Sequence, residues 1–200
     1  MVDLAYPFTG RWLVQNSPAD RVPSHGTARF ASSHAIDFVP VDDRGRTAPI
    51  TVRTMLRTEP PDRFPGFGRP ILSPADGEIV AALDTAVDHA AYRGVPSVGY
   101  ALTQARRAEA GWPALAGNHV MIRVGGTVIA LCHLQQGSVV VSVGQRVRVG
   151  DEIGRCGNSG NSTEPHVHVQ AMTSADVDHA APAPITFEGA LPRNREIVRA

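Results

Sequence analysis

Two alternating apolar runs joined by a tight turn constrain the fold of this 200-residue chain more than any other feature. Residues 118–124 and 127–134 flank Gly125-Gly126, and a glycine pair between such runs is typical of a β-hairpin. Through residues 137–154, glycines at short spacing then separate valine-rich pairs. These patterns predict a compact antiparallel structure of short strands.

The composition agrees with an all-β fold, because 19 glycines and 16 prolines favour many turns over long helices. We predict a single domain over residues 1–200, built as an antiparallel β-sandwich or half-barrel. Its core is expected to take in residues from about 10–40 and 70–172. In the first of these ranges, Arg11 to Gln15 and Ser33 to Val39 are both interpreted as strands.

Three segments are expected to lie outside this core. Residues 42–69 are polar, arginine-rich and interrupted by prolines, as in a surface excursion. The alanine-rich stretch 84–115 is interpreted as an insertion with one short helix near residues 101–110, forming a lid or wall beside the site. Residues 173–200 are expected to form an irregular tail.

The charge balance argues against two classes of partner. Arginines and acidic residues number 19 each, and the sequence has no lysine, so no broad field attracts nucleic acid. No apolar run approaches a membrane span, and the first ten residues lack the features of a secretory signal. We expect a monomer, cytoplasmic by sequence, or located in the cell wall or outside the cell if a leader has been removed.

The two cysteines, Cys132 and Cys156, are too few for a disulfide framework or for a four-thiolate zinc site. Both lie in β-patterned segments. We interpret them as small buried apolar residues.

The pair His166 and His168 is the strongest local signal of chemistry. On a strand, side chains two residues apart project from the same face, so both imidazoles would enter one space. The glycine- and asparagine-rich stretch 154–165 precedes them as a loop. The alternative is an exposed strand face that carries two solvated histidines.

Two more residues make a metal site the better interpretation. His133 closes an apolar run, at an even spacing from Ile129 and Leu131 and hence on their face of the pleat. Asp37 lies between Ile36 and Phe38, where a carboxylate is costly without a partner such as a cation. Imidazoles and a carboxylate suit zinc, and hydrolytic zinc sites use three protein ligands with an open position for water.

Four segments together resemble the successive motifs of the lysostaphin-type zinc endopeptidases, a family that cleaves peptides of the bacterial cell wall. They are Asn118-His-Val-Met-Ile, Cys132-His-Leu, Val143-Gly-Gln-Arg-Val-Arg-Val-Gly-Asp-Glu-Ile-Gly and Gly157-Asn-Ser-Gly-Asn-Ser-Thr-Glu-Pro-His-Val-His-Val-Gln. The resemblance runs in order from about residue 70 to 170, with residues 33–39 as its N-terminal partner. It implies a substrate groove, a peptide or peptidoglycan substrate and Zn²⁺ as cofactor.

The resemblance also implies the roles of individual residues. His168 and Asp37 would bind zinc, while His133 and His166 would face the catalytic water and the developing oxyanion. No His-Glu-x-x-His segment is present, so the two histidines would replace the glutamate base of helix-based metallopeptidases.

The first metal histidine departs from the family pattern, in which the histidine precedes the aspartate by four residues on one strand face. Here His34 precedes Asp37 by three, which puts the two side chains on opposite faces of a regular strand. Some relatives place this histidine in an earlier loop, where this chain has His25 followed by Gly26. We prefer His25 as the ligand and keep His34 as the alternative, which would need a bulge.

The other histidines are expected to lie outside the chemistry. His119 is interpreted as structural or exposed, and His89 and His179 as solvated surface residues. Two other functions compete with the peptidase. A phosphocarrier of half-barrel type would explain residues 143–154 but has no use for Asp37, and a non-catalytic peptide-binding relative would typically have lost the ligands.

Overall fold

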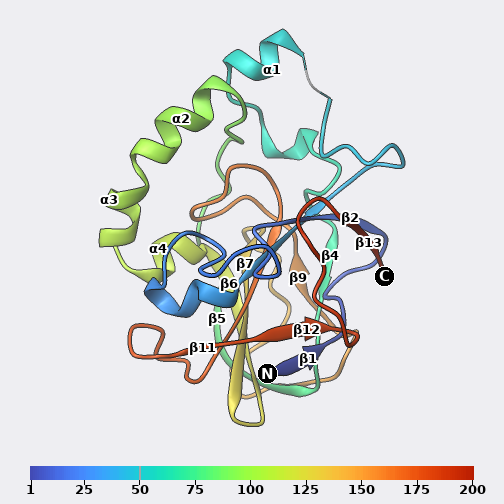
Figure 1. The fold of residues 1–200 in the computed structure, drawn as a ribbon, viewed down its shortest axis with the longest axis vertical. Coiled ribbons are helices and arrows are strands. Elements are labelled where there is room, and N and C mark those ends of the chain that lie inside the picture. The colour runs from blue at the N-terminus through green and yellow to red at the C-terminus, as the bar shows by residue number, and fades with distance from the viewer. Residues whose placement is uncertain (50) are drawn as a thin grey trace.

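One antiparallel sheet organises the molecule (Figure 1). The computed structural model describes residues 1–49 and 51–200, and within these ranges the sheet has nine strands. Their order is β13 (Ile197–Arg199), β2 (Arg11–Gln15), β3 (Ile36–Pro40), β10 (Val167–Met172), β7 (Thr127–Leu134), β6 (Asn118–Val124), β5 (Gly77–Leu83) and β8 (Arg146–Val147), with β11 (Pro182–Ala183) also on β10. The predicted hairpin is confirmed, since β6 and β7 pair up to Val124 and Thr127 across the glycine turn.

The central strands β7 and β10 are buried on both faces. On one face, alternate residues such as Leu131 and Val169 join the main hydrophobic core. On the opposite face, Cys132 and Met172 belong to a second apolar cluster, and His168 lies on this face too. The sheet therefore presents one face to the core and the other to the site.

The two chain ends close the main core. Strand β1 (Val2–Leu4) pairs in parallel with β12 (Ile185–Phe187), an exception to the predicted antiparallel pattern. Aromatic rings from both ends pack together, with Tyr6 stacked on Phe187 at 5.2 Å between ring centroids. The tail was expected to be irregular, but β11, β12 and β13 all lie within residues 173–200. That prediction was wrong because these strands are too short for a visible alternation.

The surface excursion and the insertion pack on each other and carry most of the helices (Figure 1). The excursion holds α1 (Val52–Leu56) and the short 3₁₀ turn η2 (Pro61–Arg63). The insertion holds α2 (Val95–Leu102), α3 (Gln104–Glu109) and α4 (Trp112–Ala116) where one helix was predicted. The prolines explain the error, because Pro96 and Pro113 occupy first turns, where a missing N–H costs nothing.

A partly buried ion pair joins these two segments. Arg93 donates from Nη2 to Glu59 Oε2 over 2.6 Å, and Ala91 pairs with Glu59 through the backbone.

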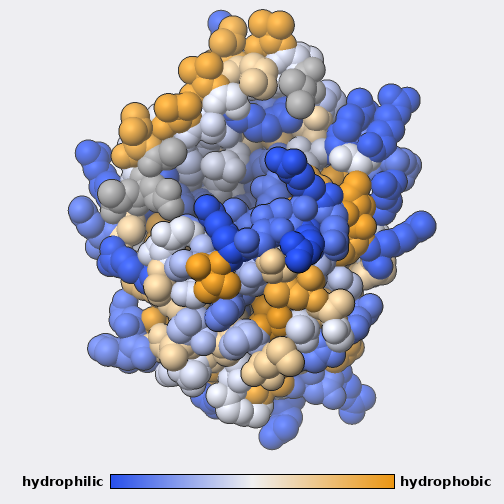
Figure 2. All heavy atoms as spheres, in the orientation of Figure 1, coloured by the Kyte–Doolittle hydropathy of each residue, from blue (hydrophilic) through white to orange (hydrophobic). Residues whose placement is uncertain are grey.

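The outer side of α1 and α2 exposes apolar side chains, seen as the orange area at the top of Figure 2. None of the helices in residues 1–49 and 51–200 has the length and apolar character needed to cross a membrane.

The strand that carries Asp37 begins later than predicted. Residues 29–34 form the 3₁₀ segment η1 (Arg29–His34), and extended backbone starts only at Ile36. Phe30 and Ala31 both have left-handed backbone, with φ of 57°. Because this turn ends at His34, that residue cannot share the pleat of Asp37.

The structure also describes the two cysteines and a second, smaller sheet. Cys132 and Cys156 are buried and unpaired thiols, as predicted. Burial raises the pKa of both thiols, which keeps them in the neutral form. Strands β4 (Pro70–Leu72) and β9 (Glu152–Arg155) form a separate two-stranded sheet in the predicted core range.

Candidate active site

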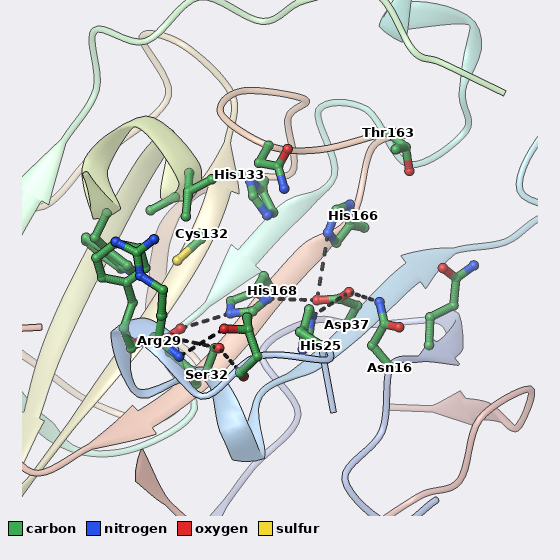
Figure 3. A pocket seen from close by; sticks show the side chains of 18 of the residues that line it. Asn16, His25, Arg29, Ser32, Asp37, Cys132, His133, Thr163, His166 and His168 are labelled. Carbon is green, nitrogen blue, oxygen red and sulfur yellow. Dashed lines mark hydrogen bonds and ion pairs between the residues drawn. The ribbon is translucent and has the colours of Figure 1, made fainter. Parts of the chain in front are cut away.

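A cavity of about 290 Å³ opens on the sheet face that carries His168 (Figure 3). Three segments enclose it: the loop and turn of residues 15–32, helix α4, and the loop of residues 157–164 that leads into β10. All five preferred histidine and aspartate residues line it, namely His25, Asp37, His133, His166 and His168. His34, the alternative to His25, does not.

Asp37 and His168 face each other because their strands are paired. Strands β3 and β10 are antiparallel, and Asp37 lies directly opposite His168 in the register. Asp37 Oδ1 is 2.9 Å from His168 Nδ1. His25 reaches the same carboxylate from its loop, with Nε2 3.0 Å from Oδ2. The three side chains offer one ligand atom each, all within 4.8 Å of one another.

The loop geometry explains how His25 arrives there. Ser24 N donates to Ser33 O over 3.0 Å, which ties the loop to the end of η1. Gly26 follows with φ of +73°, a left-handed conformation that most side chains disfavour. The loop therefore turns back towards β3 and places the imidazole over Asp37.

The hydrogen bonds on the far side of each imidazole test whether a cation fits. Ser24 Oγ donates to Ser32 O over 3.3 Å, so its oxygen accepts from His25 Nδ1 over 3.0 Å. Gln170 Nε2 donates to Phe30 O, which leaves Gln170 Oε1 to accept from His168 Nε2 over 3.0 Å. In the neutral form, each imidazole therefore has its lone pair facing Asp37.

Two lone pairs and a carboxylate aimed at one another repel unless a cation lies between them. Imidazole nitrogen and carboxylate oxygen are common ligands of zinc, and a second hydrogen bond on the outer nitrogen of each histidine is the usual arrangement. The donor set therefore fits a metal ion.

The electrostatics of Asp37 agree with this arrangement. Burial alone would raise the pKa of its carboxyl group. When these imidazoles are protonated, positive charge on His25 and His166 and hydrogen bonds from His168 and His25 outweigh burial and hold the pKa of Asp37 well below its usual range. Asn16 Nδ2 also donates to Oδ2 over 2.7 Å. The carboxylate is therefore ionised and held in place.

His133 and His166 form a second pair beside the three donors. Their rings lie 4.6 Å apart, and His166 Nε2 is 3.8 Å from Asp37 Oδ1. His133 Nδ1 donates to Ser159 O over 2.9 Å. His166 Nδ1 donates to Glu164 O over 2.8 Å. The Nε2 atoms of both imidazoles therefore remain available to a molecule in the cavity (Figure 3).

His133 reaches this face through a bulge that the sequence did not reveal. The even spacing from Ile129 and Leu131 predicted that all three share a face, and those two residues do lie in the main core. His133 instead has φ of +64°, and the pairing of β6 with β7 shifts between Asn118 and His119. The extra residue turns the imidazole to the cavity side. Burial, then positive charge on His166 and His168, lowers the pKa of His133 well below its usual value.

The remaining histidines divide as follows. His119 is buried, lies edge-on to Trp112 at 4.5 Å and donates from Nδ1 to Gly117 O, so the structural interpretation holds. Burial lowers the pKa of its imidazole. His179 is exposed, as predicted. His89 was predicted to be solvated, but it is partly buried and its Nε2 lies 2.9 Å from Gly160 O.

Several residues that orient the site were not found from the sequence. Gln170 is two residues beyond His168 on the same strand face, a spacing that could have revealed it. Ser24, Ser159 and Glu164 act through loop contacts or backbone carbonyls, which leave no signal in a single sequence. Trp112 in α4 completes one wall of the cavity.

Two curated proteins are similar to part of this chain. A glycyl-glycine endopeptidase, ALE-1 of Staphylococcus capitis, is 33% identical over 44% of this chain and 24% of its own length. The peptidoglycan DD-endopeptidase ShyA of Vibrio cholerae is 33% identical over 39% of this chain and 18% of its own length. The chain thus spans about a quarter or less of these relatives.

Among solved structures, the catalytic domain of lysostaphin from Staphylococcus simulans is 17% identical. The similarity covers 87% of this chain and 88% of the lysostaphin domain, with a TM-score of 0.43. The catalytic domain of the EnpA protein from Enterococcus faecalis has the same identity and TM-score. That similarity covers 76% of this chain and 75% of the EnpA domain.

The family comparison covers more than half of the chain. Residues 63–179 match the model of peptidase family M23. This range contains His133, His166 and His168 but neither His25 nor Asp37, which the fold brings to the same cavity. The family match confirms the resemblance to the lysostaphin-type enzymes, and the chain belongs to peptidase family M23, a family of metallopeptidases.

Proposed function

We propose that the chain is a zinc-dependent endopeptidase that hydrolyses peptide bonds in peptidoglycan cross-links or related peptides. One observation carries the proposal: three electron-pair donors, on His25, Asp37 and His168, converge beside two further imidazoles in one cavity. Hydrolytic zinc sites typically combine three protein ligands with a position open to water.

The ligand atoms of the proposed centre follow from the tautomers. His25 Nε2, His168 Nδ1 and a carboxylate oxygen of Asp37 would hold the ion. Zinc bound there would act as a Lewis acid and lower the pKa of a water molecule to about 7. Ser24 and Gln170 keep the two imidazoles oriented, because each accepts a hydrogen bond from the outer nitrogen.

We assign His133 and His166 to proton transfer. Each donates a hydrogen bond from Nδ1 to a backbone carbonyl, so each has its Nε2 lone pair available in the cavity. One imidazole accepts a proton from the attacking water. The imidazolium formed then donates from Nε2 to the developing oxyanion or transfers its proton to the leaving amine.

The proposed substrate is an extended peptide with small side chains. The cavity of about 290 Å³ is at the lower end of the range for ligand pockets and is lined by Phe30 and Trp112, which favours small side chains. The names of the two curated relatives, a glycyl-glycine endopeptidase and a peptidoglycan DD-endopeptidase, support peptidoglycan as the source of such peptides. This substrate would put the site of action at the cell wall.

Zinc analysis and cleavage assays on the purified protein test the proposal. We expect close to one zinc per chain, and new fragments from purified peptidoglycan or from a panel of Gly-rich and Ala-rich peptides. The His168→Ala variant serves as the control and should lose zinc and cleavage together. Zinc without cleavage of any of these substrates would instead support a non-catalytic peptide-binding relative, and a protein without zinc after reconstitution would contradict the proposed metal centre.

A further inference from the structure

The insertion contacts the loop that orients both proton-transfer histidines. The Tyr100 hydroxyl in α2 donates to Gly160 O over 3.0 Å. His89 Nε2 lies 2.9 Å from the same carbonyl and 3.3 Å from the Tyr100 hydroxyl, and its Nδ1 lies 2.9 Å from Ala90 O. Two polar side chains of the insertion thus meet at one peptide group of the loop.

Further contacts tie the same loop to the insertion. Arg107 donates from Nε to Asn161 Oδ1 over 2.7 Å, and its guanidinium lies over the Tyr100 ring at 3.7 Å. The rings of Tyr92 and Tyr100 stack at 4.3 Å, and Tyr92 N donates to Thr163 O over 2.7 Å. Aromatic stacking and a cation over a ring both add to the stability of such a cluster.

Gly160 lies where the loop and the insertion meet most closely. Its φ is +70°, and a Cβ built there would lie 2.4 Å from Gly117 N and 2.5 Å from Leu115 O. Asn161 N also donates to Leu115 O over 2.8 Å. The loop is therefore packed against the end of α4 and has no space to move closer to it.

The Gly160 peptide group lies close in the sequence to the two carbonyl groups that orient His133 and His166. Ser159 O, one residue before Gly160, accepts from His133 Nδ1. Glu164 O, four residues after, accepts from His166 Nδ1. Tyr100 and His89 do not line the cavity, so any effect of theirs on the chemistry passes through the loop.

We infer that the insertion is a positioning element and that the Tyr100 hydroxyl, acting through Gly160, keeps His133 in the tautomer and orientation that proton transfer requires. This inference rests on the function proposed above. Burial raises the pKa of Tyr100 to about 12, so the hydroxyl stays protonated and able to donate. Tyr100 is a positioning residue because it contacts neither the cavity nor the reacting atoms.

Two Tyr→Phe variants give a matched test. Tyr100→Phe removes the hydroxyl that holds Gly160 and keeps the ring stack. Tyr92→Phe makes the same chemical change at a hydroxyl that has no hydrogen-bond partner among the described residues. With a Gly-rich peptide as substrate, Tyr100→Phe should lower kcat about threefold to tenfold with KM and zinc content unchanged, since one hydrogen bond is lost. Tyr92→Phe should match the wild type.

Nitrogen NMR of labelled histidines provides the readout that a merely structural role would not change. In Tyr100→Phe, the His133 signals should move from the Nδ1-protonated tautomer towards a mixture, and in Tyr92→Phe they should not. Equal kcat and equal His133 signals in the two variants would overturn the inference. The same conclusion would follow if Tyr100→Phe lowered thermal stability alone.

Two arrangements keep the test decisive. If Tyr100→Phe does not fold, Arg107→Met replaces it, because this change removes the bond to Asn161 and keeps an unbranched stem over the Tyr100 ring. If the wild type cleaves no peptide, the proposed function fails. The His133 signals of the variants then decide the positioning role by themselves.

Discussion

At the scale of single residues, the site depends on which nitrogen of each histidine carries the proton. Hydrogen bonds to Ser24 and Gln170 turn two lone pairs towards Asp37, and backbone carbonyls turn the Nε2 atoms of His133 and His166 into the cavity. Five side chains of two residue types are thereby divided into a metal-binding set and a proton-transfer set. The sequence supplied the candidates, but only their partners distinguish the roles.

This division predicts that metal content and rate respond differently to substitution. His133→Ala and His166→Ala should keep nearly full zinc occupancy and lose on the order of a hundredfold or more in kcat, as when a positioned acid or base is removed. Asp37→Ala should lose both zinc and activity. Zinc analysis and peptide cleavage on the same preparations make the comparison. Loss of zinc in His133→Ala or His166→Ala, or an unchanged rate in both, would show that the roles are assigned wrongly.

At the scale of elements, the regular strands could be predicted and the departures from regularity could not. The hairpin of β6 and β7 follows from alternation around a glycine pair. The bulge at His133 and the left-handed turn at Phe30 and Ala31 carry no glycine or proline to mark them. Both displace a histidine from its predicted face. The helices of the insertion were underestimated because prolines in first turns were interpreted as breaks.

The packing of the loop against α4 predicts an unequal effect of the same substitution at two glycines. Gly160 and Gly137 have similar φ values, +70° and +72°, but a Cβ at Gly160 would meet backbone atoms while one at Gly137 meets nothing within 4 Å. Gly137→Ala should cost about 1 kcal/mol of the free energy of unfolding, the strain of a left-handed alanine. Gly160→Ala should cost more, about 2 kcal/mol or above, because the backbone must shift as well. Urea unfolding of both variants measures the difference, and equal losses would contradict the close packing.

At the scale of the whole molecule, the site combines residues from inside and outside the range that matches the family. His133, His166 and His168 lie within the matched family range, while His25 and Asp37 precede it. Antiparallel pairing of β3 with β10 accounts for Asp37. His25 could be preferred from the sequence because strand parity argued against His34 and because some relatives place this histidine in an earlier loop. Its place over Asp37 depends on contacts between the loop and the η1 segment, including that of Ser24 with Ser33, which leave no signal in the sequence.

Zinc binding in a pair of histidine variants tests this account most directly. The metal-free wild type, His25→Ala and His34→Ala are each titrated with zinc by calorimetry. The account predicts one site in the wild type, nearly the same affinity in His34→Ala, and a loss on the order of a hundredfold or more in His25→Ala, where two ligands remain. Unchanged affinity in His25→Ala, with the loss in His34→Ala instead, would contradict the proposed metal centre.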